Sequence, residues 1–303
     1  TEWHGFPQAL TRLFPNHEFY SLPTEAEIRS DPDHFPYPGF TSNRLFERAV
    51  DSPPVQARKL IARAAQEALG DRNRAAADLV IILEDLELAN LNQVDLVIRV
   101  MRGAVKSHLK ELKTRRERSQ IIDQTTRILQ SKVSFHLISL MIEAWFFADT
   151  GALARAGVPA GKQLHVDATV DPEQFVTDDP EYQAAGEADC PKWKRHAKVK
   201  RDKLRPKWLG KERERHPKGY LQWLCLSATD RTCTSYSEIQ SGSEALAAID
   251  WASLFARPAS HLQFARSLIE DIAHGLGLRP TVKPGSTCHP LTALRSGSML
   301  RNI

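Results

Sequence analysis

A chain of 303 residues with 42% hydrophobic and 26% charged residues has the composition of an ordinary globular protein and can bury a large core. It contains no stretch approaching the roughly 20 uncharged apolar residues that a membrane-spanning helix needs, and its N-terminus lacks the pattern of a secretory signal. Four scattered cysteines without a C-x-x-C pair argue against a disulfide scaffold and against a structural zinc site. We therefore expect a cytoplasmic protein with reduced thiols and no membrane partner.

The first half of the chain predicts helices interrupted by short strands. A helix is expected over residues 3–14 and a short strand over 17–23, and a second helix runs from about residue 54 to Gly70. The run "ADLVIIL" at 77–83 is short, β-branched and unbroken, which is typical of a strand buried on both faces in a parallel sheet.

Helical spacing returns at 92–112, where the polar face is rich in Lys and Arg, and again at 118–133. Residues 134–149 could begin as a strand and turn helical near residue 140. The acidic segment at about 161–190 predicts a long loop, and the chain after residue 218 is mainly helical. Strands alternating with helices predict an α/β layer fold with a parallel sheet.

Three carboxylates, Glu84, Asp85 and Glu87, follow the apolar run directly. In α/β folds, ligand sites gather at the carboxyl ends of parallel strands, and Mg²⁺ prefers carboxylate oxygens, water and phosphate as ligands. If the strand continues to Glu87, Asp85 and Glu87 point the same way and Glu84 points oppositely. Asp85 and Glu87 could then bracket a cation. In the alternative, Asp85 caps a helix and Glu87 lies near its positive end; spacing alone supports both equally.

Glu143 is a second candidate because it lies within "LMIEAWFF", where large apolar groups surround a carboxylate. It could be a further ligand to the same cation, an exposed position on an amphipathic helix, or the partner of an arginine. His136 and Ser139 lie upstream on the same segment and could contribute, although both residue types are more often structural.

A basic segment concentrates the positive charge of the chain. Its 27 residues from Lys192 to Lys218 hold 13 Lys and Arg against three acids, a net charge of +10 in a chain whose total is +4. This charge density predicts a polyanionic partner, DNA or RNA. The Lys and Arg side chains of the segment would contact phosphates, and its tryptophans could stack on bases. The predicted contact residues are Lys192, Trp193, Lys194, Arg195, Lys198, Lys200, Arg201 and Lys203.

Four stretches together resemble TOPRIM-fold proteins of the OLD-like nuclease type, particularly the small stand-alone TOPRIM-like proteins of bacteria. "TEWHGFPQAL" is similar to the end of the family's E-G-x-T-E motif, with Glu2 as its final glutamate, and "VIILEDLE" to the strand that carries D-x-D. "LISLMIEAWFFAD" resembles a later acidic segment containing Glu143, and "HPKGYLQWL" an element that supplies a lysine, Lys218. Two departures are clear: the first strand and catalytic glutamate of the motif would precede Thr1, and Glu87 replaces an aspartate.

The resemblance implies a TOPRIM-like layered α/β fold, with a mostly parallel sheet flanked by helices and a mainly helical C-terminal part. Residues 1–185 would form the core, 186–220 the basic nucleic-acid contact, and 221–303 a helical part that could pack on the same core. It also implies hydrolysis of phosphodiester bonds in DNA or RNA with Mg²⁺ or Mn²⁺. Asp85 and Glu87 would hold one ion, Glu2 and Glu143 would contribute to a second, and Lys218 would neutralise charge on phosphate.

The resemblance to these bacterial proteins further implies a role in phage defence. The partner would be an ATPase or another defence-system subunit, and the chain could also form a homo-oligomer. The missing upstream glutamate keeps a second hypothesis open: a non-catalytic nucleic-acid-binding or partner subunit with a degenerate site. A third hypothesis, phosphoryl transfer on a nucleotide, is weakened because the sequence has no Gly-rich phosphate loop.

Overall fold

The computed structural model describes residues 2–24, 26–27, 39–72, 74–116, 119–186, 212–226, 235–279, 289–294 and 297–303, without the side chains of residues 2, 3, 115, 116 and 119. The chain divides into two compact units, each built from segments that are distant in sequence. Unit 1 comprises Thr1–Thr24 and Leu140–Arg257, and unit 2 comprises Glu25–Ser139 and Pro258–Ile303. The predicted three-part division of the sequence at residues 185 and 220 stays a prediction.

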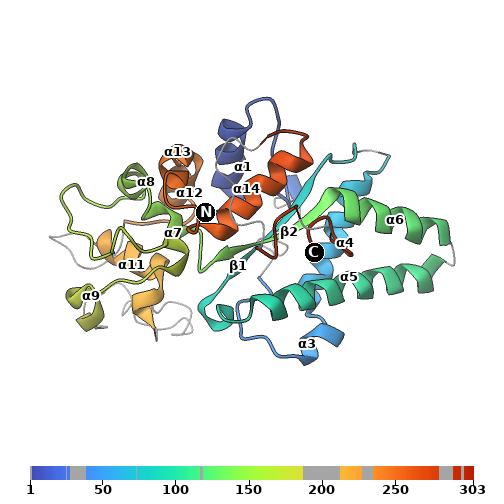
Figure 1. Cartoon of the computed structure of the whole chain (residues 1–303), viewed down its shortest axis with the longest axis horizontal. Coiled ribbons are helices and arrows are strands. Elements are labelled where there is room, and N and C mark those ends of the chain that lie inside the picture. The colour runs from blue at the N-terminus through green and yellow to red at the C-terminus, as the bar shows by residue number, and fades with distance from the viewer. Residues whose placement is uncertain are drawn as a thin grey trace. The chain divides into compact units, whose positions relative to one another are not determined.

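Unit 2 contains a parallel pair of strands, β1 (Val80–Leu86) and β2 (Val133–Ser139), paired in register from Val80 opposite Val133 to Leu86 opposite Ser139. The crossover between them runs through the 3-10 helix η2 (Leu88–Asn90) and then through α5 (Val94–Arg116) and α6 (Ser119–Lys132). Figure 1 shows the two long helices of this crossover. The α/β class is therefore confirmed, although the described residues are mostly helical and this sheet has two strands.

The burial of the two strands differs from the prediction. Every residue of β2 is buried, which fits its Val, Phe, Leu and Ile content and a position covered on both faces. In β1, Ile82, Glu84 and Leu86 are buried and the alternate residues are only half-buried. The prediction that the first strand is buried on both faces is therefore wrong, because one face of β1 packs on the core while the other is partly covered.

The helices of unit 2 pack around this pair. α4 (Val55–Leu69) carries a row of alanines toward the core and ends, as predicted, at Gly70, whose positive φ of 68° glycine adopts without strain. The close approach of α5 to the chain at Val50 requires Gly103, since a Cβ there would collide with the Val50 carbonyl oxygen. The other described helices of unit 2 are α3 (Arg48–Asp51) and α14 (Gln263–Gly275).

Unit 1 is built from short helices around an aromatic core. Trp145 packs between Phe6 and Trp251, with ring centroids 6.3 and 6.2 Å away, so α1, α7 and α13 share one core. Its elements are α1 (Glu2–Leu13), α7 (Glu143–Phe146), α8 (Thr150–Arg155), η3 (Pro172–Gln174), α9 (Pro180–Ala184), η7 (Arg213–Arg215), α11 (Pro217–Leu224), α12 (Ser241–Ala247) and α13 (Trp251–Phe255).

Most predicted elements are present, with three local differences. The strand expected at 17–23 is wrong: no ladder partner pairs with this stretch in the described chain, and a strand needs one for its backbone groups. The segment expected to be a loop contains η3 and α9, each begun by an aspartate cap followed by proline. The helical region after residue 241 is divided at Asp250, which caps α13 by accepting from the Ala252 N–H.

Within the described ranges, no helix is both long enough and apolar enough to cross a bilayer.

Candidate functional site

The three carboxylates lie at the carboxyl end of β1, where the sequence predicted them. Asp85 is within the strand, the strand ends at Leu86, and Glu87 lies one residue beyond it, just before η2. The alternation prediction holds for Glu84 and Asp85, which take the buried and half-buried faces. It does not extend to Glu87, because pairing with β2 stops at Leu86. The cap alternative is wrong for Asp85: Glu87 takes the cap position of η2, and its side chain makes no capping hydrogen bond.

Glu84 is held by the loop that precedes α3. The backbone N–H of Thr41 donates to Glu84 Oε1 at 3.0 Å, and Thr41 Oγ1 lies 2.7 Å from the same oxygen and 2.6 Å from the main-chain oxygen of Asp85. A Cβ on Gly39 would lie 2.6 Å from Glu84 Oε1, so the loop passes this close to the carboxylate only because residue 39 is glycine.

Burial raises the pKa of Glu84 above its ordinary value, although hydrogen bonds from Thr41 act in the opposite direction. The hydrogen-bond inventory points the same way. The Thr41 hydroxyl has one hydrogen, which it can donate to the Asp85 carbonyl oxygen, an acceptor only. The contact between Thr41 Oγ1 and Glu84 is then a hydrogen bond if a protonated Glu84 donates to Thr41 Oγ1. A raised pKa makes a carboxyl group a poorer cation ligand, which agrees with the lesser role that strand alternation gave Glu84.

Asn90 fixes the same loop from the other side of the site. Its buried side-chain Nδ2 donates to the carbonyl oxygens of Thr41 and Asn43 at 2.7 and 3.0 Å, and its Oδ1 accepts from the Leu45 N–H at 2.8 Å. Hydrogen bonds of Thr41 and Asn90 therefore fix the 41–45 loop to the carboxyl end of β1 and to η2. Neither residue is predicted from the sequence, since neither has a local pattern that distinguishes it from an ordinary loop residue.

Glu143 lies in α7 and is fully buried within unit 1. Its Oε1 accepts a hydrogen bond from the Tyr236 hydroxyl at 2.8 Å and lies 3.5 Å from Lys218 Nζ, and that ammonium is 3.4 Å from Glu238 Oε2. Burial alone would raise the pKa of Glu143, but the Lys218 ammonium and the Tyr236 hydroxyl outweigh it and hold the pKa below its ordinary value.

The structure therefore brings together Glu143 and Lys218, two of the predicted site residues. Glu143 is ion-paired, as one alternative expected, but with a lysine instead of an arginine, and the alternative of an exposed helix position is wrong. Asp85 and Glu87 belong to unit 2, whereas Glu143 and Lys218 belong to unit 1.

The remaining predicted site residues are less fully described. Glu2 begins α1, and its side chain is outside the described part of the chain. In the described ranges no three His, Cys, Asp or Glu side chains gather as they would to hold a metal. Two carboxylates completed by water and substrate phosphate are nevertheless a usual Mg²⁺ donor set, and Asp85 and Glu87 fit it chemically. The predicted nucleic-acid contacts Lys192, Trp193, Lys194, Arg195, Lys198, Lys200, Arg201 and Lys203 lie outside the described residues.

His136 has a structural role in unit 2. It is buried in β2, with Nε2 3.0 Å from Asp271 Oδ2, and Asp271 forms an ion pair with Arg301 at 2.5 Å. Burial opposes ionisation of Asp271, but His136 and Arg301 together hold its pKa below its ordinary value.

The C-terminal tail continues this network along the open edge of β2. The Arg301 N–H donates to the Val133 carbonyl at 2.8 Å, and the Asn302 side chain accepts from the Phe135 N–H at 3.0 Å and donates to the carbonyls of Phe135 and Leu291 at 2.8 and 2.9 Å. The tail thus satisfies backbone groups that a third strand would otherwise pair. This role is not predicted from the sequence, because a short tail of mixed polarity has no periodicity.

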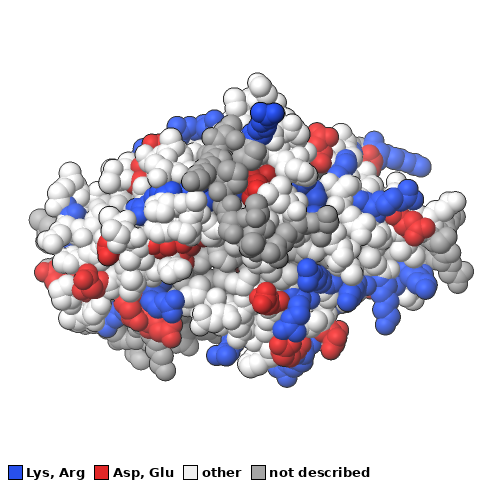
Figure 2. All heavy atoms as spheres, viewed as in Figure 1, with Lys and Arg blue, Asp and Glu red and all other residues white. Residues whose placement is uncertain are grey.

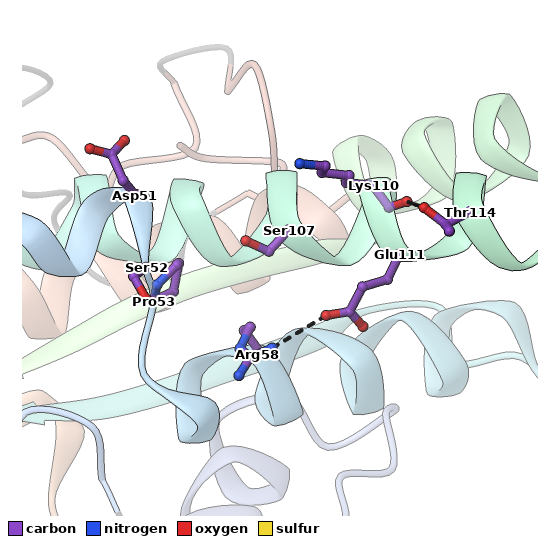
Figure 3. A pocket seen from close by; sticks show the side chains of 8 residues that line it. All are labelled: Asp51, Ser52, Pro53, Arg58, Ser107, Lys110, Glu111 and Thr114. Atoms are coloured by element: carbon purple, nitrogen blue, oxygen red, sulfur yellow. Dashed lines mark hydrogen bonds and ion pairs between the residues drawn. The ribbon is translucent and has the colours of Figure 1, made fainter.

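Two pockets lie in unit 2. The smaller, of about 450 Å³, lies between the connection from α3 to α4 and the outer part of α5, and Figure 3 shows Arg58 reaching Glu111 across it at 3.3 Å. The larger, of about 1060 Å³, is lined by residues of the 44–47 and 91–99 stretches together with Phe264, His289 and Pro290. None of the predicted site residues is among the described residues that line either pocket.

Among known proteins, no family model, curated protein or solved structure matches this chain. The similarity to TOPRIM-fold nucleases stays a prediction from its motifs.

Proposed function

We propose that this chain is a TOPRIM-like, metal-dependent nuclease that hydrolyses phosphodiester bonds of DNA or RNA. One observation carries the proposal: Asp85 and Glu87 lie at the carboxyl end of a strand in a parallel pair, where α/β folds hold their ligands. The contacts of Thr41 and Asn90 support it, because they hold the backbone at this strand end and give Glu84 a hydrogen-bonded structural role.

In this proposal Asp85 and Glu87 hold Mg²⁺ or Mn²⁺, which when bound activates water and stabilises charge on the phosphate. The raised pKa of Glu84 favours its neutral form, which lowers the repulsion that three adjacent carboxylates would otherwise create. The basic segment that follows residue 191 holds the nucleic-acid backbone.

The test is cleavage of supercoiled plasmid and of a structured RNA with Mg²⁺ or Mn²⁺, comparing wild type with Asp85→Asn and Glu87→Gln. Both variants keep side-chain shape and remove charge, and each should lower the cleavage rate at least about a hundredfold. The matched control is Asp123→Asn, an exposed acid of α6, which should cleave as wild type does. Equal cleavage by wild type and Asp85→Asn would remove Asp85 from the site, and no cleavage by wild type would overturn the nuclease.

A second function, a non-catalytic nucleic-acid-binding subunit, is favoured by the state of Glu143. Its carboxylate is already compensated by Lys218 and Tyr236, as in a structural ion pair. This function predicts salt-sensitive DNA or RNA binding in EDTA together with no cleavage in Mg²⁺ or Mn²⁺. Replacing Lys198, Lys200 and Arg201 by glutamine should then weaken binding; unchanged binding would contradict it.

A further inference from the structure

One exposed face of α5 carries a row of cations. Arg102, Lys106, Lys110 and Lys113 are all exposed, and their spacings of four, four and three residues place them on the same side of the helix. The opposite side of α5 is buried in the core of unit 2. We call these four residues the α5 row. Figure 2 shows Lys and Arg side chains gathered over the part of the face where α5 runs in Figure 1.

The α5 row is not compensated within the part of the chain that the structure describes. None of its four side chains has an ion pair there, whereas the neighbouring Arg99 forms a two-bonded pair with Glu47 and Arg58 pairs with Glu111. Like charges one helical turn apart destabilise a helix by roughly 0.2–0.5 kcal/mol for each pair. Stability of α5 therefore does not account for the row, and an external polyanion would.

The dimensions and surroundings of the row fit a nucleic-acid backbone. At about 1.5 Å of rise per residue, the row spans about 16 Å, close to the length of five base pairs of B-DNA at about 3.4 Å each. Lys110 also lines the smaller pocket together with the hydroxyl groups of Ser52 and Ser107 (Figure 3). Of the two carboxylates that line it, Glu111 is paired with Arg58, and Asp51 lies on α3. Hydroxyl groups of this kind are common phosphate contacts.

Two features of α5 select the kind of polyanion. Its sequence contains no Phe, Tyr or Trp, so the face has no platform on which unpaired bases could stack, as single-strand binders require. Its apolar side is buried in unit 2 and cannot insert into a membrane, as an amphipathic membrane helix must. Both features favour a duplex contacted through its phosphates over a single strand or a membrane surface.

We infer that the α5 row is a binding surface for the phosphate backbone of double-stranded nucleic acid, separate from the basic segment. The inference rests on the proposed function for its substrate class, and it adds a surface on which the substrate would lie. α5 begins at Val94, seven residues after Glu87 of the proposed site, and the α5 row lies further along this helix.

The test is fluorescence anisotropy of the full chain with a 20-base-pair DNA duplex in EDTA. Lys106→Gln with Lys110→Gln should weaken binding about ten- to a hundredfold at roughly 0.1 M salt and lower the salt slope of log K by about 1.8. The matched control, Lys59→Gln with Lys162→Gln, removes the same charge from exposed lysines elsewhere and should stay within about twofold of wild type. Arg102→Gln with Lys113→Gln should reproduce the loss.

Binding by the α5 double variant equal to wild type, or an equal loss in the control, would overturn the inference. So would an equal loss on a 20-nucleotide single strand, or binding of anionic phosphatidylserine vesicles that disappears with the row. Repeating the assay with an RNA duplex shows whether the α5 row contacts DNA, RNA or both. Weaker binding of either duplex by the α5 double variant supports the inference. The assay is run in EDTA and does not depend on cleavage: a wild-type chain that binds the duplex through the α5 row but does not cleave it would overturn the nuclease proposal alone, so the two failures remain distinguishable.

Discussion

Lys218 Nζ lies 3.5 Å from Oε1 of Glu143, a carboxylate whose side chain is 0% exposed. This contact explains how a glutamate can lie among large apolar residues in α7: an ammonium from the start of α11 and the Tyr236 hydroxyl compensate it. Removing one member of a buried ion pair costs more than removing both, because the remaining charge stays buried without compensation.

Replacing Lys218 by Met should therefore lower the free energy of unfolding by about 3–5 kcal/mol, measured by urea denaturation followed by circular dichroism. Glu143→Gln should cost less than Lys218→Met, because an amide oxygen can still accept from Tyr236. The double variant should recover part of the loss. A Lys218→Met chain as stable as wild type would show that the pair does not compensate a buried charge.

Replacing Glu84 by Gln should flatten the pH dependence of stability. The pKa of Glu84 is raised in the folded chain from its ordinary 4.5, because burial disfavours the charged form. At pH values between the pKa of Glu84 in the unfolded chain and its higher pKa in the folded chain, the folded state binds more protons than the unfolded state. The free energy of unfolding therefore falls as pH rises through this window. The Glu84→Gln variant has no ionisable group at this position and therefore does not lose stability there.

The measurement for Glu84 is a series of urea denaturations from pH 4 to pH 8. Above the window, the variant should be at least as stable as wild type, and its curve should be flatter within it. The control is Glu244→Gln, an exposed glutamate of α12, which should leave the shape of the pH curve unchanged. A Glu84→Gln curve parallel to that of wild type would mean that folding does not raise the pKa of Glu84.

Replacing Asn302 by Ala should destabilise unit 2 by about 3 kcal/mol or more, because the backbone groups of Phe135 and the carbonyl of Leu291 would lose their partner while buried. Hydrogen exchange should show faster exchange of the Phe135 amide, and urea denaturation should show the lower stability. Asn92→Ala, at an exposed position, should stay within about 0.5 kcal/mol of wild type. Unchanged exchange at Phe135 would contradict a role of the tail in closing the edge of β2.

Much of the fold follows from local pattern. The β-branched run before Glu84 and the apolar segment before residue 140 predict β1 and β2, and helical spacing predicts α4, α5 and α6. The positions of Asp85 and Glu87 at the end of a strand follow from the same pattern, as does the basic side of α5. These features depend on residues within a few positions of one another, where hydrophobic periodicity and side-chain alternation act directly.

Only the tertiary structure decides what those residues contact. Thr41 reaches Glu84, Lys218 reaches Glu143, and Asn302 reaches Phe135, and each pair is distant in sequence. A buried carboxylate in the sequence signals that a partner must exist, because an uncompensated charge is costly to bury, but it does not name the partner. Which cation, hydroxyl or amide satisfies it depends on how the helices pack, and that packing is selected by the summed burial of many side chains instead of by any short stretch of sequence.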